Sequence, residues 1–334
     1  MKILLTGGVG YIGSHTAVAL AQAGHEVTLF DNLSNSRPEV VDHIEKIVGY
    51  RIPLIEGDVR DTEMLSTALR DQGTDAVIHL AGLKAVGDSV REPIEYFSNN
   101  VQGAISLLKA MHLNAIKRIV FSSSATVYGT PQYLPYDEEH PTQAINPYGR
   151  TKLHVEEMLQ DLALSDSGWQ IAILRYFNPV GAHDSGLIGE QPNGVPNNLM
   201  PYLAQVASGR LRELTVFGDD YPTRDGTGER DYIHVMDLAE GHLAALNFLA
   251  QKQGWHAFNL GTGHATTVME LVRQFEHASN RHIPLSISGR RAGDLPAYYA
   301  KATKAKQVLG WEAKRGIEDM CSSAWRWERG LHDH

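Results

Sequence analysis

The chain has 334 residues, of which 43% are hydrophobic and 21% charged, and this composition indicates one large globular domain or a domain with a smaller lobe. Its formal net charge of −9 at pH 7 argues against a general affinity for nucleic acid or for an anionic membrane. The single cysteine, Cys321, excludes an intrachain disulfide and a cysteine metal cluster, and it favours a reducing, cytoplasmic setting.

A strand, a glycine turn, a helix and a second strand are predicted within the first 31 residues. The apolar run 3–5 is too short for a signal peptide or a membrane span, and it leads into Gly7-Gly8-Val9-Gly10-Tyr11-Ile12-Gly13. A helical stretch covers 14–24, and residues 26–30 form a second apolar run that ends at Asp31. This order is typical of the first βαβ unit of a dinucleotide-binding fold.

Each glycine of the turn suits a different requirement of a bound dinucleotide. Gly7 permits the tight turn, Gly10 lets the backbone approach a pyrophosphate, and Gly13 lets the helix pack close to the strand. The free N–H groups at the helix N-terminus favour the phosphates. Because the spacing is G-x-x-G-x-x-G, an ordinary strand-to-helix turn is the alternative. Asp31 would accept hydrogen bonds from ribose hydroxyls and thus favours NAD over NADP, although the nearby Arg37 leaves that choice open.

Four further segments follow before residue 113. A helix is expected from Pro38, and the strand 51–56 leads to Asp58, which is either an adenine contact or a turn or N-cap aspartate. The strand 75–80 continues into 81–84, where Lys84 is either a cofactor contact or a solvated loop cation. A long helix is predicted over about 93–112, and its internal asparagines need acceptors for their amide hydrogens.

The next strand and helix carry the candidate chemistry. The strand 117–121 runs into Ser122-Ser123-Ser124, whose hydroxyls would point into the ligand crevice at the carboxyl end of a parallel strand. Asn146 is a suitable N-cap and Pro147 a suitable first residue for the following helix. Tyr148 and Lys152 are then one turn apart on the same face of that helix.

Tyr148, Lys152 and Ser124 together suggest proton transfer coupled to hydride transfer. A free tyrosine, with a pKa of about 10, is a poor base at neutral pH, but a neighbouring ammonium and a nicotinamidium would favour the phenolate. The phenolate could then remove an alcohol proton while hydride leaves the same carbon, with Ser124 holding the hydroxyl. A half-exposed helix pair is the alternative for Tyr148 and Lys152 considered alone.

The alternation of strands and helices up to residue 180 predicts an α/β fold with a doubly wound parallel, Rossmann-type sheet. The stretch 184–201 is rich in Gly, Pro and Asn and begins a smaller, mixed α/β C-terminal lobe. We therefore expect an NAD-binding domain over 1–180, a smaller lobe over 181–334, and a return of about 232–262 to the first domain. Later elements are expected at 197–208, 214–217, 236–251, 257–260, 267–278 and 285–288, with terminal helices from about 303 and 316.

The glycine turn, the seryl strand end and the Tyr-x-x-x-Lys pair resemble the extended short-chain dehydrogenases. Longer segments resemble the UDP-glucose 4-epimerase family, and the similarity runs nearly end to end. These segments are Asn178–Glu190, Pro196–Leu199, Asp225–Val235 and Arg290–Pro296.

The resemblance implies an isomerase of galactose metabolism, usually dimeric, that interconverts UDP-glucose and UDP-galactose with bound NAD. Tyr148 would take the 4-hydroxyl proton, hydride would pass from C4 to NAD, and the transient 4-keto sugar would turn and receive hydride on its other face. The family pattern assigns these residues to NAD, with Tyr148 and Lys152: Gly7, Gly10, Tyr11, Ile12, Gly13, Asp31, Asn32, Leu33, Ser34, Asn35, Ser36, Asp58, Val59, Leu80, Ala81, Gly82, Leu83, Lys84, Asn99 and Phe177. It assigns these to the UDP-sugar, with Ser124: Asn178, Asn198, Leu199, Thr215, Val216, Phe217, Arg230, Arg291, Asp294 and Tyr298.

Residue chemistry supports the polar part of this assignment. Arg230 and Arg291 suit a diphosphate because the guanidinium binds in a bidentate manner, although surface salt bridges are the alternative. Asp294 could bind the uridine ribose, and Phe217 either flanks uracil or packs in the core. The resemblance places Tyr298 in the sugar pocket, where bulk disfavours N-acetylated hexoses. The 16 histidines form no recognisable metal set, so no metal is expected.

Three other functions are weighed against the epimerase. A nucleotide-sugar dehydratase often has Asp-Glu after the seryl strand end, whereas here Ala125-Thr126 follows Ser124. An NADP-dependent carbonyl reductase is disfavoured by Asp31, and a silent NAD sensor would not need Tyr148 and Lys152. The resemblance also implies that the lobe 181–334 binds the UDP-sugar, and that a homodimer forms through the helices near 93–112 and 147–165.

Overall fold

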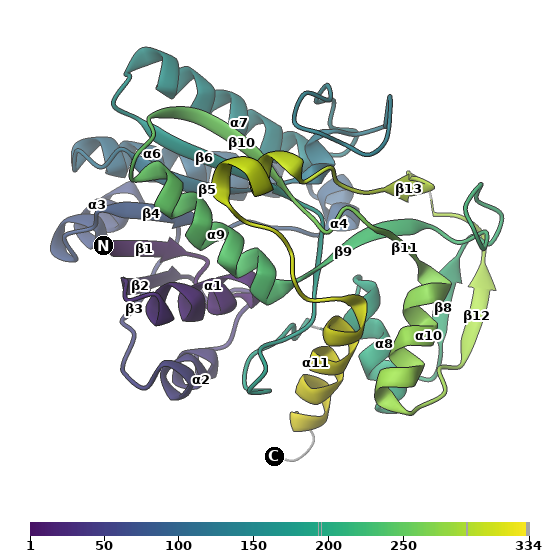
Figure 1. The fold of residues 1–334 in the computed structure, drawn as a ribbon. Coiled ribbons are helices and arrows are strands. Elements are labelled where there is room, and N and C mark those ends of the chain that lie inside the picture. Colours follow the sequence, from purple (N-terminus) through teal and green to yellow (C-terminus); the bar gives the residue numbers. More distant parts are fainter. Residues whose placement is uncertain (193, 195, 292, 332–334) are drawn as a thin grey trace.

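The computed structural model describes residues 1–192, 194, 196–291 and 293–331, and a seven-stranded parallel sheet forms its larger part (Figure 1). The strand order is β10-β6-β5-β4-β1-β2-β3. The bounds are β1 Lys2–Thr6, β2 Glu26–Asp31, β3 Leu54–Glu56, β4 Ala76–His79, β5 Arg118–Ser124, β6 Gln170–Tyr176 and β10 Gly254–Leu260. The reversal of order at β1 and β4 creates the crevice at which doubly wound sheets bind ligands. The predicted fold class is confirmed.

Helices cover both faces of this sheet. On one face lie α1 (Tyr11–Gln22), α2 (Glu39–Val48) and α9 (Val235–Leu249), whose apolar side chains share one core with β1 and β2. On the other face lie α3 (Thr62–Asp71), α6 (Gly103–Leu113) and α7 (Pro147–Ser165), which share a second core with β4 and β5. Because both faces are covered, the strands are apolar along most of their length.

A smaller group of elements lies beyond the carboxyl ends of these strands (Figure 1). Its central strand β9 (Glu229–His234) pairs with β7 (Asn178–Val180), β11 (Ala265–Thr267) and β13 (Ala297–Tyr298), while β8 (Leu214–Phe217) pairs with β12 (Leu285–Ser288). Helices α8 (Leu199–Ala207), α10 (Val268–Ser279) and α11 (Ile317–Gly330) pack on one another around a separate core. None of the helices in the described part of the chain is long and apolar enough to cross a membrane.

Two elements differ from the sequence prediction in an informative way. The helix expected over 93–112 consists of α5 (Pro93–Tyr96), a π-helical turn η1 (Phe97–Gln102) and α6, preceded by the short α4 (Val86–Arg91). Such π turns place an extra residue in the helix and frequently occur at functional sites. The strand expected over 51–56 is shorter because Pro53 precedes it. The shorter helical turns are η2 (Ala125–Val127) and η3 (Ala305–Leu309).

Candidate functional site

The glycine turn between β1 and α1 is packed so closely that side chains would not fit. Gly7 has a φ of +70°, and a Cβ there would lie 2.7 Å from the backbone N of Ala81. A Cβ on Gly13 would lie 2.1 Å from the carbonyl oxygen of Gly7. α1 therefore begins directly against the strand end, where the first N–H groups of a helix lack intrahelical partners and attract phosphate. These features fit the pyrophosphate of a dinucleotide.

Asp31, the last residue of β2, joins the glycine turn to the loop 32–36. Its carboxylate accepts hydrogen bonds from the N–H of Val9 at 3.0 Å, the N–H of Leu33 at 2.9 Å and the hydroxyl of Ser36 at 2.9 Å. Asp31 is buried, and these three hydrogen bonds fix the position of its carboxylate beside the crevice. The location suits hydrogen bonding to ribose hydroxyls. Asn32, Ser34 and Asn35 surround it on the exposed part of this loop.

The segment 80–84 after β4 lies between the glycine turn and η1. The side chain of Asn100 accepts from the N–H of Leu83 at 2.8 Å and donates to the Leu83 carbonyl at 3.0 Å and to Thr151 at 3.0 Å. Asn100 thus receives the partners that its amide requires, and it fixes this segment against α7. Asn100 is one of the internal asparagines of the helix predicted over about 93–112, and its need for partners inside the protein was the signal in the sequence for this role.

Other residues expected at the cofactor have partners of their own. Asp58 accepts two bonds from the Arg60 guanidinium, at 2.9 and 2.7 Å, and this contact lowers the pKa of Asp58. Lys84 forms an ion pair of 2.9 Å with Glu190, a residue that the sequence argument did not single out. Asn99 is half-buried in η1, and Val59 is buried. These residues lie around the crevice, and their contacts with NAD stay predictions.

Tyr148, Lys152 and Ser124 meet at the carboxyl end of β5. Asn146 caps α7 by accepting from the N–H of Gly149 at 2.8 Å, and the helix then presents Tyr148 and Lys152 on one face. The Lys152 ammonium donates to the Ser122 carbonyl at 2.8 Å and lies 6.0 Å from the centre of the Tyr148 ring. Ser124 hydrogen-bonds the Tyr148 side chain, and all three residues are buried.

Burial dominates the protonation of this group. Burial raises the pKa of Tyr148 to about 12, although the hydrogen bond from Ser124 acts in the opposite direction. Burial also lowers the pKa of Lys152 to about 8, although the negative charge of Glu156 opposes it. The spacing of Lys152 and Tyr148 indicates that an ammonium and a bound nicotinamidium favour the phenolate, but in the protein alone desolvation of the phenol dominates and raises its pKa. Ionisation of Tyr148 therefore needs further positive charge beside it.

An aromatic group borders the Tyr148 side of the crevice. Tyr298 on β13 packs with ring centres 5.0 Å from Phe177 and 5.2 Å from Tyr136. Among the residues that the structure describes, the Tyr298 hydroxyl and the Asn178 side-chain oxygen are buried without a hydrogen-bond partner. Buried polar atoms of this kind are satisfied by a ligand or by water, which is consistent with a sugar pocket here.

The residues expected at the nucleotide come from several elements of the smaller lobe. Arg230 donates to the carbonyls of Glu229 and Leu295, at 2.8 and 2.9 Å, and its guanidinium lies 3.8 Å from Asp294. Arg291 stacks over the ring of Phe217 at 3.8 Å, a cation–π contact. Phe217 ends β8, which also contains Thr215 and Val216.

Asn198, just before Leu199 at the start of α8, donates to Glu190 at 2.8 Å. Glu190 therefore contacts one residue expected at NAD, Lys84, and one expected at the UDP-sugar. Nothing in the composition of the segment 178–190 distinguished its single glutamate from an exposed loop carboxylate, which is why sequence reasoning missed it.

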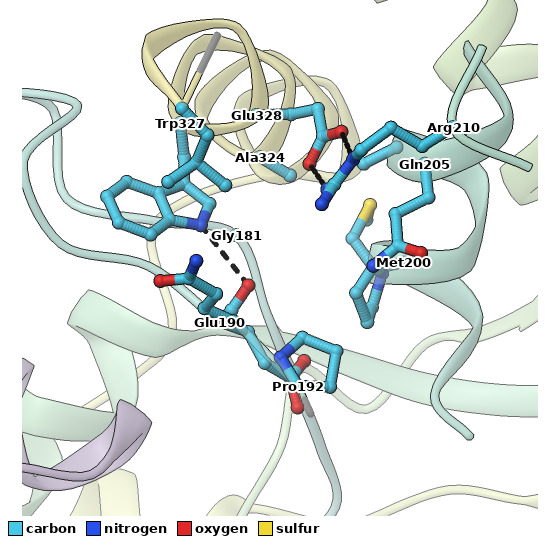
Figure 2. A pocket seen from close by; sticks show the side chains of 13 residues that line it. Gly181, Glu190, Pro192, Met200, Gln205, Arg210, Ala324, Trp327 and Glu328 are labelled. Carbon is cyan, nitrogen blue, oxygen red and sulfur yellow. Dashed lines mark hydrogen bonds and ion pairs between the residues drawn. The ribbon is translucent and has the colours of Figure 1, made fainter. Parts of the chain in front are cut away.

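A separate cavity lies behind this region, between the loop 181–192, α8 and α11 (Figure 2). It holds about 390 Å³ of space that is partly open to solvent. Figure 2 shows the Trp327 indole, which donates to the Glu190 carbonyl at 3.2 Å, on one side and the Arg210–Glu328 ion pair on the other. Tyr148 and Lys152 do not line this cavity, so it is distinct from the centre described above.

A doubly wound sheet with a glycine turn, an acidic residue ending β2 and a Ser-Tyr-Lys group defines a dinucleotide-dependent enzyme of the short-chain dehydrogenase class. The chain belongs to the NAD dependent epimerase/dehydratase family, which it matches over residues 3–261, and within it to the UDP-glucose 4-epimerases. The resemblance found in the sequence is thereby confirmed. Among the described residues, no three His, Cys, Asp or Glu side chains are grouped so that they could hold a metal ion.

Relatives and solved structures agree with this assignment. The chain is 53% identical to UDP-glucose 4-epimerase from Bacillus subtilis (strain 168) over 328 residues, which cover 98% of this chain and 97% of the relative. It is 54% identical to the enzyme of the same name from Neisseria gonorrhoeae, with the same coverage. The crystal structure of UDP-glucose-4-epimerase from Stenotrophomonas maltophila with bound NAD and formylated UDP-arabinopyranose is similar at a TM-score of 0.98 and 49% identity, covering 100% of this chain and 99% of that chain. That of the Bifidobacterium longum enzyme with NAD+ and UDP has a TM-score of 0.96 and 48% identity, with the same coverage.

Proposed function

We propose that the protein epimerises UDP-galactose and UDP-glucose at C4 with bound NAD. The observation that carries the proposal is the buried group formed by Tyr148, Lys152 and Ser124 at the end of β5, in a fold whose glycine turn packs the start of α1 directly against the end of β1. Relatives about half identical in sequence and matched over nearly their full length are UDP-glucose 4-epimerases, which supports the same activity here.

The side chains divide the work as follows. Tyr148 accepts the proton of the sugar 4-hydroxyl and later returns it, and the Ser124 hydroxyl holds that oxygen in place. Lys152 stabilises the phenolate by its charge, because the Ser122 carbonyl keeps its ammonium one helical turn from the phenol. NAD, when bound, accepts hydride from C4 and returns it to the opposite face of the transient 4-keto sugar.

The glycine turn, Asp31 and the segment 80–84 would hold NAD, while Arg230 and Arg291 would bind the diphosphate. Neither guanidinium has a close ion pair among the described residues. That of Arg230 lies 3.8 Å from Asp294, and that of Arg291 lies over the aromatic ring of Phe217. Charge-assisted hydrogen bonds to phosphate are stronger than these contacts. Binding of the nucleotide is therefore favourable at both positions.

Incubation of the purified protein with UDP-galactose, without added NAD, tests the proposal. Formation of UDP-glucose with no net NADH supports it, whereas a dehydrated product or net NADH would support a dehydratase or a dehydrogenase. The absence of any conversion, with NAD bound, would support a sensor.

We also propose that the protein acts as a homodimer in a reducing cytoplasm. A groove on α5, η1 and α6 is lined by Pro93, Ile94, Phe97, Ser98, Val101, Gln102 and Ile105, and the Ile94 side chain is 85% exposed. An apolar helix face of this kind, beside α7, suits packing against a second copy. Sedimentation analysis of the wild type and of Ile94→Lys tests this: a dimer that becomes monomeric is expected, and a monomeric wild type would contradict it.

A further inference from the structure

The three serines at the end of β5 contact three successive turns of α7. Ser124 hydrogen-bonds Tyr148, the Ser122 carbonyl accepts from Lys152, and the Ser123 hydroxyl donates to Glu156 at 2.5 Å. Residues 148, 152 and 156 are four apart, so they lie in one row along the helix. The first two contacts belong to the reacting group, whereas the third has had no role so far.

The carboxylate of Glu156 accepts hydrogen bonds from Arg175 as well as from Ser123. Arg175 on β6 donates to its carboxylate from Nη2 at 2.6 Å and from Nε at 3.1 Å to each oxygen. Glu156 and Arg175 are 2% and 4% exposed, and the guanidinium also donates to the Tyr128 hydroxyl at 3.2 Å. A buried bidentate pair with a hydroxyl donor has a defined geometry and excludes sliding of the helix along the strand.

We propose that Glu156 is a positioning residue for the reaction, which fixes the register of α7 on β5 and supplies the negative charge that keeps Lys152 an ammonium beside Tyr148. The proposal rests on the proposed function, because it concerns the same pair of residues. It assigns to Glu156 a role that acts through Lys152, without contact to substrate or cofactor.

The charge balance around Lys152 supports this role. Burial pulls the pKa of Lys152 down to about 8, and the charge of Glu156 raises it against that effect. Among the described residues, the other titratable groups that face this region do not supply negative charge. Burial raises the pKa of Tyr148 and Tyr96 to about 12 and that of Tyr176 further, and burial with the Lys152 charge lowers the pKa of His79 to about 3, so all four are neutral near pH 7. Arg175 is cationic and stays bound to the carboxylate.

The test removes the charge without leaving an unpaired partner. A single change at Glu156 would strand a buried guanidinium, which strongly destabilises a protein, so the variant is Glu156→Gln/Arg175→Met. The chain offers a matched control in Glu328→Gln/Arg210→Met, because that ion pair also receives a serine hydroxyl, from Ser208, and lies away from the reacting group.

The measurement is the pH profile of kcat for epimerisation from about pH 6 to about pH 9.5. In the Glu156 double variant the alkaline limb is expected at lower pH, so that kcat above the limb falls about tenfold for each pH unit of displacement. The control is expected to keep the wild-type profile. A profile that keeps its wild-type limb, even with a lower kcat at every pH, would overturn the proposal.

A second variant and a second readout cover the remaining outcomes. If the double variant does not fold, Glu156→Asp is measured instead, because it keeps the negative charge but withdraws the carboxylate by one methylene. A smaller displacement of the alkaline limb is then expected. An alkaline limb at the wild-type pH would overturn the proposal. An NMR titration of lysines isotope-labelled at Cε reads the pKa of Lys152 without turnover. A wild type that does not epimerise would refute the proposed function, while this titration would still judge the role of Glu156.

Discussion

Replacing Gly13 by alanine is expected to destabilise the protein and to remove its bound NAD. The new Cβ would lie 2.1 Å from the Gly7 carbonyl oxygen and 2.8 Å from the Gly8 Cα, both far inside ordinary contact distance. Since these are backbone atoms, the glycine turn has to move. Overpacking of this kind costs up to about 3 kcal/mol. Alanine regains about 1 kcal/mol of helix propensity, which leaves a net loss of up to about 2 kcal/mol.

The matched control is Gly87→Ala. Gly87 lies in the short helix α4, is exposed, and has no atom within 4 Å of an added Cβ. There the propensity term acts alone, and a gain of up to about 1 kcal/mol is expected. Thermal unfolding of both variants gives the stability, and extraction followed by chromatography gives the NAD content of the purified proteins.

The two readouts separate the physical causes. Displacement of the turn also moves the N-terminus of α1, so Gly13→Ala is expected to contain little NAD and to lose the additional stabilisation that a bound ligand confers. A Gly13→Ala protein with wild-type melting temperature and full NAD content would refute the packing argument. It would also remove the main reason for placing the pyrophosphate at this turn.

Three further outcomes are expected. Tyr148→Phe retains NAD but loses kcat by a factor of about 10² to 10⁴, the usual contribution of a positioned acid–base group, and rates near wild type in a coupled UDP-glucose assay would refute its role. Tyr298→Cys opens the aromatic border of the crevice, so turnover of UDP-N-acetylglucosamine should rise from a weak wild-type level; no gain would contradict its place in the sugar pocket. Melting temperatures should fall as the pH falls from about 6.5 to about 4, because burial lowers the pKa of four histidines in the folded state, so that the unfolded chain binds more protons in this window; a flat profile would contradict it. These four are His15, His79, His234 and His242, with pKa values of about 3, 3, 4 and 4.

Local sequence rules were sufficient for most of the large sheet and its helices, because these elements carry their own signals, whereas the strand β9 at the centre of the smaller lobe was not predicted. The glycine turn, the cap at Asn146 and the apolar strands β1, β2 and β5 are determined by neighbours in the sequence. The π turn η1 was not predictable in this way. It contains Asn100, whose side chain contacts Leu83 and Thr151, residues 17 and 51 positions away, and such distant partners cannot be identified from neighbours in the sequence.

The same distinction applies to the candidate site. Tyr148 and Lys152 could be identified because they are separated by one helical turn, and Asp31 because it ends a strand. Glu190 and Arg175 could not, since their roles arise from contacts across the sheet and between lobes. Burial is also a property of the assembled fold, so residue spacing alone did not reveal that desolvation raises the pKa of Tyr148 in the protein without ligands.

The raised pKa of Tyr148 has a consequence for how the reaction is controlled. With a pKa of about 12, ionising the phenol at about pH 7.5 requires about 6 kcal/mol. Lys152 alone does not supply this free energy, since burial disfavours its charged form and lowers its pKa to about 8. The missing stabilisation has to come from charge that enters the site with the ligands, because the Ser124 hydrogen bond already acts on the pKa of about 12. A tyrosine buried in this way is inert until the site is filled, so proton transfer is confined to the state in which the sugar can also give up its hydride.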